Sequence, residues 1–142
     1  MIQLPLPESL KSYRDEFIEK IEGSKDVDGM KKESKFIPPT VKAVLEILSL
    51  SRNEVEVEIE NICVVGASGT VGKSLVKELK KRGNNVLEAD ENIKNIGSLT
   101  KTADVVISAT GVINLISPDM IKQDVILIDV GSPFGDIDPR CS

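Results

Sequence analysis

The second half of the sequence alternates short, continuously apolar runs with segments of helical periodicity, and this alternation limits the possible folds more than any other feature. The apolar runs lie at residues 62–65, 86–87, 105–108 and 125–130. Residues 71–82 carry apolar side chains at helical spacing, and Gly83 follows as a helix stop. Strands that are apolar throughout and separated by helices belong to parallel sheets with helices on both faces. We therefore predict an α/β domain over residues 54–142.

Further helices are predicted both within this domain and in front of it. A helix should open at residues 117–119, where Ser, Pro and Asp supply a cap, a favoured first residue and a first-turn acid. The front part, residues 1–53, is charged and punctuated by prolines. We expect an amphipathic helix there between Pro7 and about Gly23, and then a second helix, capped by Thr40, that leads into the α/β domain.

The turn between the first predicted strand and the following helix is rich in glycine. It reads Gly66-Ala67-Ser68-Gly69-Thr70-Val71-Gly72. Glycine allows a tight turn and a close approach to a diphosphate, whose charge is stabilised by free N–H groups and the positive end of the helix dipole. Ser68 adds a hydroxyl donor. The strict G-x-G-x-x-G spacing is not met, so a tight turn that binds nothing stays open as the alternative.

Two acidic residues, Glu88 and Asp90, stand at the end of the second predicted strand. In a dinucleotide site an acid at this point hydrogen-bonds the ribose hydroxyls of NAD and repels the extra phosphate of NADP. We therefore favour NAD over NADP. Glu91 is a further candidate, and the alternative is that these acids only face solvent.

Composition excludes several classes of function. The net charge of −5, with lysines interspersed among acids, argues against a surface for nucleic acid or anionic membrane. The sequence has no histidine, which excludes Ser-His and Cys-His hydrolase mechanisms. No apolar stretch approaches the roughly 20 residues of a membrane span. Cys63 and Cys141 lack metal-binding spacing, so we predict no metal site and a cytoplasmic protein.

Further motifs occur in the order of a known family. They are Gln3-Leu4-Pro5-Leu6-Pro7, Lys25-Asp26-Val27-Asp28-Gly29, Pro38-Pro39-Thr40, Ala109-Thr110-Gly111, and Ile128-Asp129-Val130-Gly131 followed by Gly135-Asp136. Together with the glycine turn they resemble the bifunctional methylenetetrahydrofolate dehydrogenase/cyclohydrolase family. The resemblance implies a Rossmann-like NAD(P)-binding domain over residues 54–142, preceded by a mostly helical remnant of the folate-binding, catalytic domain over residues 1–53.

In that family, hydride passes from 5,10-methylenetetrahydrofolate to NAD or NADP, and the methenyl product is hydrolysed. By motif position, Asp28 resembles the carboxylate that binds the pterin ring, and Gln3 resembles the amide that positions a catalytic lysine. Residues 66–72 would hold the cofactor, and Thr110 and Gly111 would lie against its nicotinamide half. Family members are commonly homodimers, which implies a dimer here too.

Two motifs of the family do not occur in this sequence. One is the Y-x-x-x-K motif of the catalytic lysine, upstream of Q-L-P-L-P, and the other is a later P-V-P-G-G-V-G-P loop. We therefore expect weak or no cyclohydrolase activity from the chain alone. One alternative is a non-catalytic NAD(P)-binding module or a fragment that needs a partner chain. Another is an extended short-chain dehydrogenase or epimerase, although no tyrosine follows Tyr13 to supply that group's Y-x-x-x-K pair.

Overall fold

The computed structural model describes all residues except 1, 3–5, 32, 55–57, 91–95 and 142. The chain forms two compact units, Met1–Pro39 and Thr40–Ser142. Helix α2 (Pro39–Glu54), the predicted connecting helix, belongs almost wholly to the second unit. The reason is that the apolar face of α2 is buried, with Val41 and Val44 almost fully excluded from solvent.

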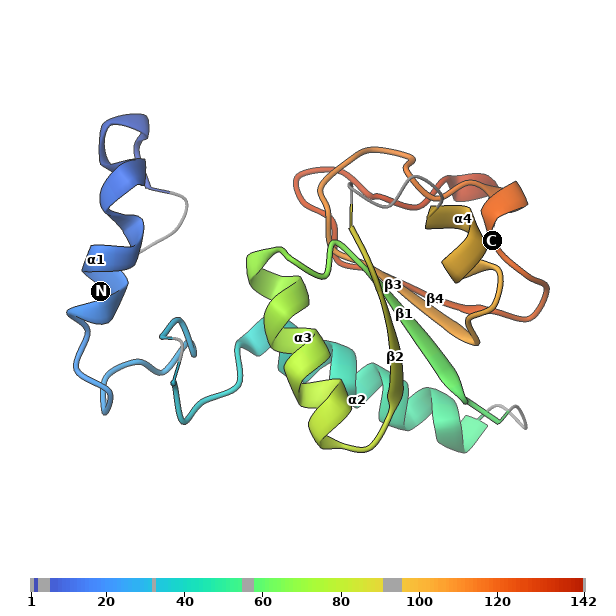
Figure 1. Ribbon diagram of the computed structural model, residues 1–142, viewed down its shortest axis with the longest axis horizontal. Coiled ribbons are helices and arrows are strands. Elements are labelled where there is room, and N and C mark those ends of the chain that lie inside the picture. Colours follow the sequence, from blue (N-terminus) through green and yellow to red (C-terminus); the bar gives the residue numbers. More distant parts are fainter. Residues whose placement is uncertain (1, 3–5, 32, 55–57, 91–95, 142) are drawn as a thin grey trace. The chain divides into compact units, whose positions relative to one another are not determined.

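The second unit is built on a parallel sheet of four strands. These are β1 (Asn61–Val65), β2 (Asn85–Ala89), β3 (Val105–Ser108) and β4 (Ile126–Asp129). Their order is β2-β1-β3-β4, and every neighbouring pair is parallel (Figure 1). All four carboxyl ends therefore lie at one edge of the sheet. The next two strands in the sequence, β2 and β3, lie on opposite sides of β1. The strand order therefore reverses beside β1.

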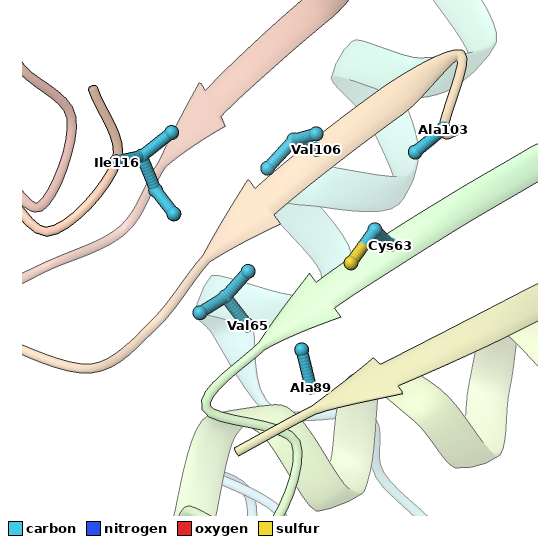
Figure 2. Packing of buried hydrophobic residues seen from close by; sticks show 6 residues of the cluster. All are labelled: Cys63, Val65, Ala89, Ala103, Val106 and Ile116. Carbon is cyan, nitrogen blue, oxygen red and sulfur yellow. The ribbon is translucent and has the colours of Figure 1, made fainter. Parts of the chain in front are cut away.

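Helices cover both faces of this sheet, as the apolar strands predict. Helices α2 and α3 (Thr70–Lys81) lie on one face, and the short helix α4 (Ile96–Thr100) lies on the other (Figure 1). On the α4 side, alternate strand residues form one apolar cluster, which Figure 2 shows on a single face of the sheet. Its buried members are Cys63, Val65, Ala89, Ala103, Val106 and Ile116. The observed architecture confirms the predicted α/β, Rossmann-like class.

The helix predicted from residue 117 onward is wrong in length. The structure has only a 3-10 turn there, η2 (Pro118–Met120). The Ser117 hydroxyl donates to the Asp119 carboxylate at 2.6 Å and caps no backbone N–H. Ile121 then returns to extended backbone, which ends the turn. A second short 3-10 turn, η3 (Pro139–Cys141), follows β4.

The first unit is helical at its start and consists of turns thereafter. A 3-10 segment, η1 (Glu8–Tyr13), runs directly into helix α1 (Arg14–Glu19). The single helix predicted to reach about Gly23 therefore ends earlier and changes type on the way. Little of its apolar stripe is buried: η1 has no buried residue, and in α1 the buried residue is Ile18. Similarly, α2 begins at Pro39, a favoured first helical residue, so Thr40 lies inside the first turn and is not the cap.

Among the described residues, no helix is both long enough and apolar enough to cross a membrane.

Candidate dinucleotide site

The glycine turn lies at the carboxyl edge of the sheet, between β1 and α3. The N–H groups of Gly66 and Ala67 donate to the carbonyl of Ala89, at the end of β2, at 2.8 and 3.3 Å. Ser68 N–H donates to the Asp90 carboxylate at 2.8 Å. The turn is thus fastened to the neighbouring strand beside the point where the strand order reverses. Ligands of open α/β sheets bind in such crevices.

Two glycines of the turn have no room for a side chain. Gly66 has a φ of 84°, and a Cβ on it would lie 2.8 Å from the carbonyl oxygen of Ala109. A Cβ on Gly72 would lie 2.0 Å from the carbonyl oxygen of Gly66. The turn therefore packs directly against the start of α3 and against the loop after β3, and glycine is required for both contacts.

The first turn of α3 has amide groups that the hydrogen bonds within the helix do not use. Gly69 occupies the N-cap position and provides no side-chain cap. The first helical bond runs from Lys73 N–H to the Gly69 carbonyl at 2.9 Å. The N–H groups of Thr70, Val71 and Gly72 consequently have no acceptor among the described residues. Three aligned donors and the positive end of a helix dipole form a binding place for an anion.

The two predicted ribose acids differ in their surroundings. Glu88 forms an ion pair with Lys80 of α3, with 2.5 Å between Oε1 and Nζ. Asp90 follows β2 at the carboxyl edge, where Oδ1 accepts the Ser68 N–H and Oδ2 has no donor among the described residues. The contacts therefore favour Asp90 over Glu88 for a ribose hydroxyl. Glu91 lies outside the described residues.

The loop after β3 forms the other wall of the crevice. Gly111 has a φ of 73°, and a Cβ there would lie 2.8 Å from the Ser132 carbonyl oxygen. The Thr110 methyl lies beside Gly66, 3.0 Å from where a Cβ on that glycine would stand. The structure thus brings the predicted residues Thr110 and Gly111 next to the glycine turn.

Sequence reasoning did not single out Asp136, which organises this wall. Its Oδ2 accepts hydrogen bonds from the hydroxyls of Ser108 and Thr110, at 2.7 and 2.9 Å, and from the Thr110 N–H at 2.6 Å. Asp136 was visible only as part of a Gly-Asp pair beyond the fourth strand. Nothing local in that pair indicates that it folds back onto β3.

The predicted folate residues belong to the first unit. Asp28 is exposed in a turn and makes no hydrogen bond or ion pair with the described residues, while Gln3 lies outside them. The turn is held by the buried Asp26, which accepts the N–H groups of Met30 and Lys31 at 2.8 and 2.9 Å. Burial opposes ionisation of Asp26, but these N–H groups and the Ser34 hydroxyl hold its pKa below the usual value.

An open hollow of about 730 Å³ occupies one side of the first unit. Lys31 and Phe36 are among the residues that line it, and Asp28 is not. The Lys31 ammonium donates to the carbonyls of Glu19 and Ile21 at 2.9 and 2.8 Å, which closes this part of the chain on itself. The hollow therefore does not coincide with the predicted pterin carboxylate.

The residues of the second unit fit a nicotinamide dinucleotide. Its diphosphate requires donors at a helix start and a backbone without side chains nearby, and residues 66–72 provide both. Residues 38–138 match the family model described as the tetrahydrofolate dehydrogenase/cyclohydrolase NAD(P)-binding domain. The chain belongs to the tetrahydrofolate dehydrogenase/cyclohydrolase family.

Relatives in this family are about one third identical to the chain over the aligned residues. It is 34% identical over 140 residues to the bifunctional protein FolD of Lactobacillus acidophilus, which covers 92% of this chain and 48% of that protein. It is 35% identical over 141 residues to FolD of Campylobacter jejuni, with 92% and 49% covered. The chain therefore spans about half the length of the curated relatives it matches.

Solved structures of the family have the same fold. The crystal structure of the bifunctional FolD enzyme from Campylobacter jejuni aligns with a TM-score of 0.82 at 33% identity, over 97% of this chain and 54% of that one. The bifunctional enzyme from Thermoplasma acidophilum gives a TM-score of 0.84 at 26% identity, over 99% and 54%. These likenesses favour the folate family over the short-chain dehydrogenase alternative.

Proposed function

We propose that this chain binds NAD or NADP and forms the dinucleotide half of a methylenetetrahydrofolate dehydrogenase/cyclohydrolase. The observation that carries the proposal is the set of three unused amides at the start of α3. They face a turn whose glycines keep side chains away. When bound, the nicotinamide ring supplies a hydride acceptor for the methylene carbon of 5,10-methylenetetrahydrofolate. The methenyl product is then hydrolysed to the 10-formyl form.

In this proposal the residues of the chain mainly bind and orient. The N–H groups of Thr70, Val71 and Gly72 donate to the diphosphate, and the exposed hydroxyl of Ser68 adds a donor. Asp90 Oδ2 accepts a ribose hydroxyl, while Oδ1 keeps its bond to Ser68. A carboxylate at this point repels a 2′-phosphate, which favours NAD over NADP.

The folate would lie against the first unit. The Asp26 bonds hold the turn so that Asp28 reaches solvent, where its carboxylate is free to accept hydrogen bonds from a pterin ring. Gln3 would position the catalytic lysine, which a partner chain would have to supply because the Y-x-x-x-K motif does not occur in this sequence.

Four of the lysines in the first unit already have partners within that unit. Lys11, Lys20 and Lys25 pair with nearby glutamates at 2.5, 2.5 and 3.0 Å, and Lys31 binds backbone carbonyls. A catalytic lysine needs a free amine within hydrogen-bond reach of the reacting group. This supports weak or no cyclohydrolase activity by the chain alone, and it favours as second candidate a binding module that a partner chain completes.

The proposal includes a cytoplasmic homodimer. Strands β2 and β4 form the two edges of the described sheet, and unpaired edge strands have hydrogen-bonding groups available for association. Sedimentation at micromolar concentration is expected to show a dimer, and a strict monomer would contradict this part.

Isothermal titration with NAD and with NADP tests binding, beside an absorbance assay with methylenetetrahydrofolate. Saturable binding with preference for NAD, together with little or no cyclohydrolase turnover, is expected. The matched variants are Gly72→Ala, whose methyl would strike the Gly66 carbonyl, and Gly23→Ala, whose methyl meets nothing within 4 Å. Only the first should weaken binding. Absence of binding by the folded wild-type chain would refute the proposal, and full cyclohydrolase turnover would refute its second part.

A further inference from the structure

Asp136 is a fully buried carboxylate that has no lysine or arginine partner among the described residues. Its three hydrogen bonds all reach the same oxygen, Oδ2, and they come from the end of β3 and from the loop beyond it. Burying an ionised group without a partner of opposite charge is costly, and hydrogen bonds offset that cost only in part. Packing alone therefore does not account for an aspartate at this position.

The second oxygen of Asp136 makes the position still more costly. Oδ1 is buried and has no hydrogen-bond donor among the described residues. It lies against Gly131, where an added Cβ would stand only 2.2 Å away. A buried acceptor without a donor is unfavourable, and such an atom in a native protein calls for an explanation.

The bonds of Asp136 fix the backbone of the loop after β3. It holds both the N–H and the hydroxyl of Thr110, and that hydroxyl in turn accepts the Val112 N–H at 3.1 Å. Gly111 lies between these two anchored residues with its backbone against the Ser132 carbonyl. Asp136 thus determines where the Thr110–Gly111 peptide stands.

The strand order places this loop at a particular part of the cofactor. In the proposed site, the turn after β1 would hold the diphosphate, and Asp90 at the end of β2 would bind the adenosine ribose. With the order β2-β1-β3-β4, the residues at the end of β3 would then hold the nicotinamide half. The glycine turn has anchors of its own, the Ala89 carbonyl and the Asp90 carboxylate. Asp136 therefore serves the nicotinamide side of the crevice and leaves the adenosine side to other residues.

We propose that Asp136 is a positioning residue that holds the Thr110–Gly111 backbone against the nicotinamide half of NAD(P). The inference rests on the proposed function. It assigns to Asp136 the affinity that the nicotinamide ring adds. ADP-ribose measures this contribution, because it has the adenosine, the diphosphate and both riboses of NAD but lacks the nicotinamide ring.

The test compares two ligands with two aspartate variants. NAD and ADP-ribose are titrated calorimetrically into the wild-type chain, Asp136→Asn and Asp138→Asn. Asp138 is a matched control because it belongs to the same segment, but its carboxylate binds Arg140 and accepts no hydrogen bond from Ser108 or Thr110. In the wild type and the control, NAD should bind about tenfold more tightly than ADP-ribose, as one or two hydrogen bonds would provide. In Asp136→Asn this ratio should fall close to one, with ADP-ribose binding within about twofold of wild type.

If Asp136 had a purely structural role, Asp136→Asn would weaken the binding of NAD and of ADP-ribose equally, and that result would overturn the inference. So would an unchanged ratio in Asp136→Asn. If this variant does not fold, Thr110→Val and Thr110→Ser replace it. Valine removes the hydroxyl that Asp136 holds and should lower the ratio, while serine keeps it and should preserve the ratio. A wild-type chain that binds neither ligand would refute the proposed function, whereas one that binds both with equal affinity would refute only the role of Asp136.

Discussion

Replacing Thr70 with proline should remove one of the amides proposed to bind the diphosphate and leave helix α3 intact. Thr70 is the first residue of α3, a position where proline is favoured because its missing N–H would have no helical partner. Gly69 before it has φ −69° and ψ 171°, an extended conformation that a following proline prefers. The change therefore deletes one of the three unused donors without forcing the chain to move.

The expected loss follows from the strength of a single bond. A hydrogen bond to a charged group contributes about 1.5–3 kcal/mol, so the dissociation constant for NAD should rise roughly 10- to 100-fold. Folding stability should stay the same or rise by about 0.4–1 kcal/mol, because proline restricts the unfolded chain. Affinity and stability thus move in opposite directions, which general damage to the fold cannot produce.

Isothermal titration and urea denaturation measure the two quantities in the same samples. Thr70→Ala is the control, since it removes the hydroxyl but keeps the amide, and it should bind NAD within a few fold of wild type. The reasoning fails if Thr70→Pro binds NAD as tightly as Thr70→Ala does, or if both lose affinity to the same extent.

Three further predictions concern single side chains. Asp90→Asn should narrow the preference for NAD over NADP several-fold in paired titrations, and an unchanged preference would exclude Asp90 from the ribose site. The Arg140 guanidinium lowers the pKa of Asp138 to about 2. The ionised Asp138 carboxylate therefore stabilises the fold fully above its unfolded pKa of about 4, and this stabilisation is lost as pH falls toward 2. Over this pH range the urea midpoint of Asp138→Asn should fall less than that of wild type. Burial raises the pKa of the Cys63 thiol to about 12, so a thiol reagent should modify the part-exposed Cys141 first and Cys63 only on unfolding; fast labelling of native Cys63 would contradict its burial.

The sheet could be predicted because its determinants are local. Residues 62–65 and 105–108 are apolar without interruption, and they form β1 and β3 nearly as the pattern indicates. The position of the glycine turn between a strand and a helix followed from the same pattern. The helix after Ser117 was mispredicted, because the Ser117 hydroxyl bonds to Asp119 and not to the backbone.

The remaining features depend on residues distant in sequence. The sequence around Glu88 does not indicate that its carboxylate pairs with Lys80 of α3. Likewise, the sequence around Asp136 does not indicate that its carboxylate accepts a hydrogen bond from Ser108 on β3. These contacts arise only once the sheet has formed, so sequence patterns of short range do not contain them. The resemblance to a known family supplied the position of Asp28, and its contact with folate stays a prediction.

A titration of the ¹⁵N-labelled chain with NAD, followed by amide chemical shifts, tests the central claim most directly. The account predicts that the amides of Thr70, Val71 and Gly72 show the largest changes, since they have no acceptor among the described residues, and that Thr110 and Gly111 follow. Changes confined to the unit Met1–Pro39, or no saturable change at residues 70–72 at millimolar NAD, would contradict it.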